Sequence, residues 1–170
     1  MILSILFLIL QLGFVVFFLY MCIASITGAP FVPTKTTTAQ SMIRLAAIKK
    51  GDIVYDLGSG NGKLLLAAAE KGATAIGYEI NPLLVLYSNI LSLLYRQSKT
   101  RTYWKNFWNA DIKNADVVFI YLLPWKMEAL AEKLKKDCKK GTRIVSNSFI
   151  FPGWKITRQD ATRHAYVFTI

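Results

Sequence analysis

The sequence is poor in the side chains that most metal sites and nucleophilic active sites need. His164 is the only histidine, and the two cysteines, Cys22 and Cys138, lie far apart in the chain. A disulfide framework and a cysteine or multi-histidine metal cluster are therefore excluded, and we expect no metal site. A Ser-His-Asp arrangement would depend on one histidine close to the C-terminus. We interpret His164 as a structural residue.

Charge is absent from Met1 to Thr34, and the stretch from Ile2 to Ile26 is almost entirely apolar. About 23 helical residues at about 1.5 Å each reach about 35 Å, which is enough to cross a hydrocarbon core of about 30 Å. A secretory signal peptide would have a basic n-region and a shorter apolar core. We therefore predict that residues 1–27 form an uncleaved transmembrane helix.

Acidic residues are scarce, with 10 Asp and Glu against 21 Lys and Arg, for a net charge of +11. Basic residues dominate the segment just after the apolar run, which holds Lys35, Arg44, Lys49 and Lys50 against Asp52. This excess is typical of the cytoplasmic side of a single-pass membrane protein. Three explanations for the excess of basic residues stay open. The domain could bind an anionic lipid surface, it could bind nucleic acid, or the charge could simply keep it soluble.

Strands and helices alternate after a connector at residues 28–36. We predict helices at 37–50 (ended by Gly51), 63–71, 82–97 and 126–136. Strands are predicted at 52–58, 74–80, 115–123 and 142–151, a further strand with its exit loop within 102–111, and a hairpin within 154–170. Repeated βαβ units indicate one α/β domain over residues 37–170, with a doubly wound, mostly parallel sheet. The hairpin would add an antiparallel strand at one edge.

The expected helix at Leu83–Tyr95 is apolar on all sides. Helices of this kind are usually buried, so we expect it in the core, with contact to a bilayer as the alternative.

A glycine-rich loop, Asp56-Leu57-Gly58-Ser59-Gly60-Asn61-Gly62, follows the first expected strand of the domain. Ligands of doubly wound sheets bind at the carboxyl ends of the strands, and glycines let the backbone approach a ligand closely. A phosphate-binding P-loop would need glycine at Leu57 and Ser or Thr at Leu64, and a dinucleotide fingerprint would need glycine at Lys63. Glu79, at the end of the next strand, can accept hydrogen bonds from both hydroxyls of a ribose.

Together, Asp56–Gly62 and Glu79 resemble motifs I and II of class I S-adenosylmethionine-dependent methyltransferases. Four further stretches narrow the resemblance to the small protein-lysine N-methyltransferases of archaea, bacteria and mitochondria, several of which carry an N-terminal hydrophobic segment. These stretches are PFVPT (30–34), GYEINPLLV (77–85), YLLP (121–124) and FIFPGW (149–154). The resemblance implies a seven-stranded, Rossmann-like methyltransferase fold and S-adenosylmethionine as cofactor.

The resemblance also implies roles for individual residues. Glu79 would hold the ribose with Asn81 at its border, and Asp111 would meet the adenine amino group. Pro33 and Thr34 would cover the methyl-transfer site. The loop residues Asp56, Gly58, Ser59, Gly60 and Gly62 would shape the cofactor pocket, and Tyr121 to Pro124 would line the methyl-transfer site. From the sequence alone, Asp111 is also explained as a turn residue and Tyr121 as core packing.

Asn61-Gly62-Lys63 replaces the Asp-Gly-Arg that is common in the family. The asparagine keeps a polar contact and the lysine keeps the charge. The aromatic residues Trp104, Phe107 and Trp108 are interpreted as core or interface residues rather than as a substrate platform.

These features suggest a membrane-anchored enzyme that methylates a lysine of a membrane-associated protein. An apolar, aromatic pocket lowers the pKa of a lysine by desolvation, so Tyr121 to Pro124 can act without a dedicated base. Positioning carries much of the catalysis of such a transfer. Two alternatives stay open: an RNA, small-molecule or lipid methyltransferase on the same fold, and a cofactor-binding membrane scaffold without catalysis.

Overall fold

The computed structural model describes residues 2–27, 32–96 and 99–170 and divides the chain into two compact units, Met1–Pro30 and Phe31–Ile170. In the first unit, a single helix, α1, spans Ile2–Thr27. Its segment Ile2–Leu19 is long and apolar enough to cross a membrane by length and composition, a criterion that an N-terminal signal sequence also meets.

The second unit is built on a seven-stranded sheet in the order β3-β2-β1-β4-β5-β7-β6. Strands β1 to β5 are parallel, and β7 is antiparallel to both β5 and β6. This confirms the predicted mostly parallel sheet with an antiparallel hairpin at one edge. The strands are β1 (Ile53–Leu57), β2 (Thr74–Glu79), β3 (Thr100–Trp104), β4 (Val117–Ile120), β5 (Arg143–Asn147), β6 (Arg158–Asp160) and β7 (Ala165–Thr169).

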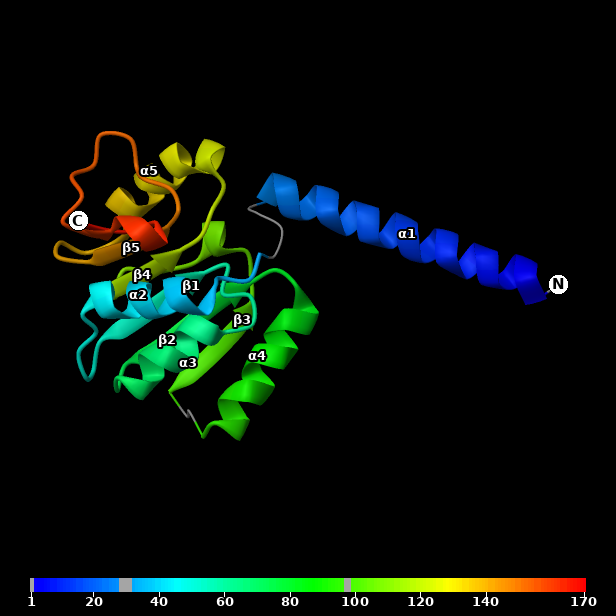
Figure 1. The fold of residues 1–170 in the computed structure, drawn as a ribbon, viewed down its shortest axis with the longest axis horizontal. Coiled ribbons are helices and arrows are strands. Elements are labelled where there is room, and N and C mark those ends of the chain that lie inside the picture. The colour runs from blue at the N-terminus through cyan, green and yellow to red at the C-terminus, as the bar shows by residue number, and fades with distance from the viewer. Residues whose placement is uncertain (1, 28–31, 97–98) are drawn as a thin grey trace. The chain divides into compact units, whose positions relative to one another are not determined.

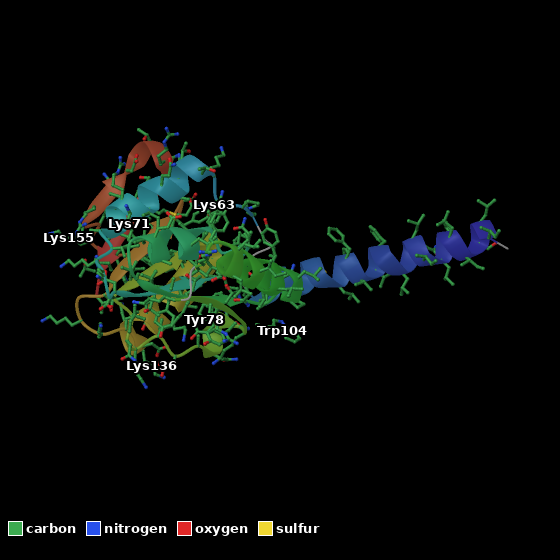
Figure 2. The ribbon with its side chains drawn as sticks, turned by 90° about the horizontal axis from the view of Figure 1, so that it is seen from below. Lys63, Lys71, Tyr78, Trp104, Lys136 and Lys155 are labelled. Carbon is green, nitrogen blue, oxygen red and sulfur yellow. The ribbon has the colours of Figure 1, made fainter. Side chains whose placement is uncertain are left out.

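Helices cover both faces of the sheet. Helices α2 (Thr36–Ala46) and α3 (Lys63–Glu70) pack their apolar stripes on one face, and Val54, Ala75 and Phe119 belong to the same buried cluster. Helix α5 (Met127–Asp137) lies on the other face. In Figure 2, Lys71 at the end of α3 and Lys136 of α5 lie on opposite sides of the sheet. Helix α4 (Pro82–Leu94) lies along the β3 edge (Figure 1). Short 3₁₀ helices occupy Phe107–Asn109, Pro124–Lys126 and Ala161–Arg163.

Several predicted boundaries differ from the structure: the strands expected at 115–123 and 142–151 are shorter, Val117–Ile120 and Arg143–Asn147. Two other differences have clear local reasons. Helix α2 ends before Gly51 because Ala47 adopts a left-handed conformation (φ 47°) and its N–H bonds to the Arg44 carbonyl. The third strand runs from Thr100 to Trp104, earlier than expected, because the Asn106 side chain accepts a hydrogen bond from the Trp108 N–H and starts a 3₁₀ helix.

The prediction that the apolar helix after Pro82 is buried in the core was wrong. In the described structure the buried residues of α4 are Ser88 and Ser92, whereas six of its large apolar side chains are exposed and Leu84, Val85 and Leu91 are half-buried. The reason is that α4 contacts the edge strand β3 through hydrogen bonds rather than through an apolar stripe.

Helix α2 is held to the far edge of the sheet by polar contacts. The Asp160 carboxylate accepts hydrogen bonds from the Ser41 hydroxyl at 2.6 Å and from Arg44 at 2.9 Å. Hydrogen bonds from Ser41 and Thr162 lower the pKa of Asp160 to about 2. This contact fixes α2, and with it the segment before α2 that leads to the site described next.

Candidate active site

The glycine loop between β1 and α3 is pinned to the neighbouring strand. The backbone N–H groups of Gly58 and Ser59 both donate to the Tyr78 carbonyl, at 2.9 and 3.1 Å. Gly58, Gly60 and Gly62 have positive φ angles of 88°, 53° and 76°, which only glycine adopts without strain. The loop is thereby held at the carboxyl edge of the sheet, where the strand order reverses between β1 and β4.

Two of these glycines serve different purposes. A Cβ on Gly62 would lie 2.0 Å from the Ser88 hydroxyl oxygen, so Gly62 lets α3 and α4 come together. A Cβ on Gly58 would meet nothing within 4 Å, and Gly58 is exposed. Gly58 therefore leaves open space over the end of β1, on the side where a ligand would approach.

Glu79 connects the loop to the start of α4. One of its carboxylate oxygens accepts a hydrogen bond from the Gly60 N–H at 2.9 Å, and the other accepts one from the Asn81 N–H at 2.8 Å. Asn81 in turn caps α4, because its side-chain oxygen accepts a hydrogen bond from the Leu83 N–H at 2.9 Å. Each carboxylate oxygen of Glu79 has a second lone pair, so the buried side chain can accept further hydrogen bonds from a ligand.

Asp56 is a second buried carboxyl group beside Glu79. Burial and the charge of Glu79 raise the pKa of Asp56 to about 8. Two buried carboxyl groups side by side favour a cationic ligand, which would stabilise their charged forms. The sulfonium and ammonium groups of S-adenosylmethionine supply that charge, and its ribose supplies the hydroxyls that Glu79 can hold. The residues present therefore fit this cofactor.

The segment before α2 reaches the loop through Lys63. The Lys63 ammonium group donates to the Thr34 carbonyl and to the Thr36 hydroxyl, both at 3.3 Å. Thr34, which the resemblance places over the methyl-transfer site, is thus tied to the first residue of α3. The structural role of Lys63 was not anticipated. Its position directly after the loop, as the basic residue at the start of a helix, is the signal that could have revealed it.

Tyr121 and Pro124 follow β4 at the same edge of the sheet. Ile120 pairs with Leu57 in the parallel register, so Tyr121 and Gly58 both lie just beyond the ends of neighbouring strands. Tyr121 is half-buried, and Pro124 is exposed and begins a 3₁₀ helix. The methyl-transfer roles of these two residues and of Thr34 stay predictions.

Ser148, directly after β5 at the same edge of the sheet, has a backbone conformation that the sequence did not predict. Ser148 has a φ of 68°, a conformation that is uncommon outside glycine, and its N–H donates to the His164 carbonyl at 2.6 Å. Its hydroxyl donates to the side-chain oxygen of Asn147 at 2.9 Å. Strained residues of this kind gather at functional sites, and β5 is the neighbour of β4. Its place directly after a strand that ends at this edge is the only sequence signal.

Asp111 is connected to the glycine loop through Tyr78, because the Asp111 carbonyl accepts a hydrogen bond from the Tyr78 hydroxyl at 3.4 Å. Its carboxylate is exposed, accepts a hydrogen bond from the Lys113 N–H at 3.1 Å and pairs with the Lys113 ammonium at 3.0 Å. Hydrogen bonds from Lys113 lower the pKa of Asp111. These contacts are those of a turn residue, and the adenine contact that the resemblance implies stays a prediction.

The sheet order, the glycine loop and the paired carboxyl groups together define the fold of a class I S-adenosylmethionine-dependent methyltransferase. The structure is similar to that of an RNA methyltransferase from Salinibacter ruber in complex with S-adenosyl-L-homocysteine, with a TM-score of 0.77 and 32% sequence identity, over 82% of this chain and 94% of that one. It is also similar to the C-terminal domain of precorrin-6Y C5,15-methyltransferase from Rhodobacter capsulatus (TM-score 0.65, 22% identity, covering 77% and 78% of the two chains), which supports the fold alone.

The chain belongs to the family described as the ANTKMT methyltransferase domain, which matches residues 56–158. It is 36% identical over 133 residues to a protein-lysine N-methyltransferase of Saccharolobus islandicus (strain REY15A), covering 74% of this chain and 80% of that protein. It is 34% identical over 128 residues to a human lysine N-methyltransferase named for the c subunit of ATP synthase, covering 74% of this chain. The chain spans about half (54%) of the length of the human relative. The predicted family resemblance is confirmed.

Proposed function

We propose that this chain is a membrane-anchored methyltransferase that moves the methyl group of S-adenosylmethionine to a lysine side chain of a membrane-associated protein. The observation that carries the proposal is the buried pair of Asp56 and Glu79 at the glycine loop. Together these residues offer charge to a cation and hydrogen-bond acceptors to a ribose. The family of the chain and the names of its relatives favour lysine as the acceptor.

In this proposal the residues at the carboxyl edge position the groups that react. Glu79 and the loop hold the cofactor, which supplies an electrophilic methyl group on a sulfonium when bound. Tyr121 and Pro124 line an apolar site that lowers the pKa of the incoming lysine, so the lysine proton passes to water before the transfer. Thr34, held by Lys63, closes the site from the N-terminal side and limits access of water. The single histidine is not needed as a base.

The substrate would be a membrane-associated protein. Several relatives carry names that specify the c subunit of ATP synthase, and we infer a protein substrate that is associated with the membrane and presents a lysine near the bilayer surface. Helix α1 would cross the membrane, and the excess of Lys and Arg just after it would keep the methyltransferase domain on the cytoplasmic side. An anchored enzyme searches only the bilayer surface for its acceptor.

The proposal is tested by incubating the purified full chain with methyl-labelled cofactor and membranes from its host. We expect label in protein, in methyl-lysine after hydrolysis, and none with the Glu79→Ala variant. Label found only in RNA or lipid would contradict the proposal. Cofactor binding without any transfer would identify a scaffold.

RNA is the second candidate acceptor. Its support is the named activity of the Salinibacter ruber protein together with the net charge of +11. Total RNA from the same host, offered in place of membranes, distinguishes the two: transfer to RNA at a rate above that to membrane protein would favour this candidate.

The anchor is tested separately by washing membranes that contain the chain with carbonate and with high salt. A transmembrane helix keeps the protein in the pellet after both washes. Release by carbonate would show that α1 does not span the bilayer.

A further inference from the structure

Helix α4 directs its polar side chains toward the sheet. The Ser88 hydroxyl bonds to the Thr102 hydroxyl at 2.8 Å, and the Ser92 hydroxyl donates to the Thr100 carbonyl at 3.0 Å. The Asn89 side chain donates to the Thr102 carbonyl and accepts from the Thr102 N–H, both at 2.9 Å. This is the reverse of a surface helix on a soluble domain, whose apolar stripe faces the core.

The apolar residues of α4 form a continuous stripe on the opposite side, which we term the outer α4 face. Spacings of three and four residues place its members on one side of the helix. They are 45% to 79% exposed and comprise Leu83, Leu86, Tyr87, Ile90, Leu93 and Leu94. An exposed apolar stripe of this extent marks a surface that contacts a membrane or another molecule.

The surroundings of the outer α4 face are aromatic and basic. Tyr95 ends the helix and is 63% exposed, and Trp104, labelled in Figure 2, is 70% exposed with its ring N–H bonded to the Ile80 carbonyl at 2.9 Å. Between residues 81 and 105 the sequence contains no acidic side chain. Two exposed basic residues, Arg96 and Lys99, follow the helix before β3 begins. Arg101 and Lys105 face the opposite side of the sheet from α4, where they lie over the rings of Tyr103 and Tyr78.

We propose that the outer α4 face inserts into the interfacial region of an anionic bilayer, as a second membrane contact besides α1. Apolar side chains would enter the acyl boundary, Tyr and Trp would lie at headgroup level, and the basic residues would meet anionic lipid. A two-fold contact between copies is disfavoured, because it would bring the same basic residues of each copy together.

The contact has a consequence for the site. Glu79 bonds to both the glycine loop and Asn81, which caps α4, so a bilayer that holds α4 also sets the height of the carboxyl edge above the lipid. The methyl-transfer site is then held near the headgroups, where a lysine of a membrane protein lies. This consequence rests on the proposed function, whereas the membrane contact itself does not require any methyl transfer.

The test uses the full chain with Cys22→Ser and Cys138→Ala and one new cysteine that carries an environment-sensitive fluorophore. Leu86→Cys reports on the outer α4 face, and Lys136→Cys on α5 is the control (Figure 2). Both proteins are reconstituted into phosphatidylcholine vesicles with and without phosphatidylglycerol. Quenching is measured with nitroxide on the lipid acyl chains and with aqueous iodide. Both probes share the same anchor, so any difference between them arises from the domain.

We expect the Leu86 probe to be quenched by lipid nitroxide several-fold more than the Lys136 probe and to be protected from iodide, more strongly with phosphatidylglycerol. Equal quenching of the two probes would overturn the proposal. Protection of the Leu86 probe from iodide without lipid quenching would also overturn it, because a protein would then cover the face.

A second variant separates charge from apolar insertion. Arg96→Gln with Lys99→Gln removes two basic side chains and leaves the stripe unchanged. We expect it to abolish the effect of phosphatidylglycerol on Leu86 quenching, as added salt should in the parent protein. An unchanged effect of phosphatidylglycerol would refute the role of the basic residues. Because none of these readouts measures methylation, failure of this proposal is distinguishable from failure of the proposed function.

Discussion

Gly62→Ala should destabilise the domain strongly, because two separate costs meet at one position. An alanine at φ 76° costs about 1–2 kcal/mol of backbone strain. Its Cβ would also lie 2.0 Å from the Ser88 hydroxyl oxygen and 3.1 Å from the Ser88 Cβ, so the helices must separate slightly. Overpacking of this kind costs about 1–3 kcal/mol. The sum is about 3 kcal/mol, or a fall in Tm of about 10 °C for a domain of this size.

Gly58→Ala is the matched control, because it has the same backbone strain (φ 88°) but open space around its Cβ. It should lower the Tm by about 4 °C, a third to a half of the Gly62→Ala effect. The assay is thermal unfolding of the full chain in detergent, followed by circular dichroism. Adding Ser88→Ala to Gly62→Ala removes the nearest clashing atom and should recover part of the loss. Equal Tm shifts for the two glycine variants, or additive effects of Gly62→Ala and Ser88→Ala, would refute the reasoning.

Three further predictions concern the carboxyl pair and the edge strand. Glu79→Gln puts an amide N–H against a backbone N–H and should weaken cofactor binding at least about tenfold, since a hydrogen bond to a charged group is worth about 1.5–3 kcal/mol. Calorimetry measures this affinity, and an unchanged value would contradict the ribose assignment. Because the pKa of Asp56 is raised from 3.8 to about 8, the cofactor-free native state binds an extra proton between these values. The free energy of unfolding that this proton contributes is complete below pH about 4 and is lost as the pH rises toward 8. In urea unfolding, Asp56→Asn should flatten this dependence of stability on pH. Asn89→Ala removes both hydrogen bonds to the backbone of β3 and should cost about 2 kcal/mol in the same unfolding assay, whereas no change would show that the edge strand holds without α4.

Local patterns explain why the sheet and the loop could be predicted. Strands β1 and β4 are short, mostly apolar runs between turn signals. Asn81 as the cap and Pro82 as the first residue mark the start of α4 within the chain itself. The glycine spacing in Asp56–Gly62 needs no knowledge of distant residues, because it reflects backbone angles that only glycine adopts easily. Glu79 was identified for a similar reason: it ends a strand, and strand ends meet ligands in this fold.

The contacts between distant residues could not be read from the sequence. An apolar run does not state which side of a helix meets the sheet, so α4 was placed in the core although Ser88, Asn89 and Ser92 hold it by hydrogen bonds. Likewise, the bond between Lys63 and Thr34 joins segments that only the packing of α2 against α3 brings together. The left-handed backbone of Ser148 also occurs together with a hydrogen bond from its N–H to the carbonyl of His164, a residue of a later segment.

The sequence by itself thus determined the order of strands and helices, the backbone freedom of the loop and the chemical types at the strand ends, because these depend on neighbours along the chain. The tertiary structure alone decided which groups share the site and which remain outside it. It brought Asp56 against Glu79 and so raised the pKa of Asp56, and it turned the apolar stripe of α4 outward. The physical reason is that burial and charge coupling depend on distances in space, which the sequence does not state.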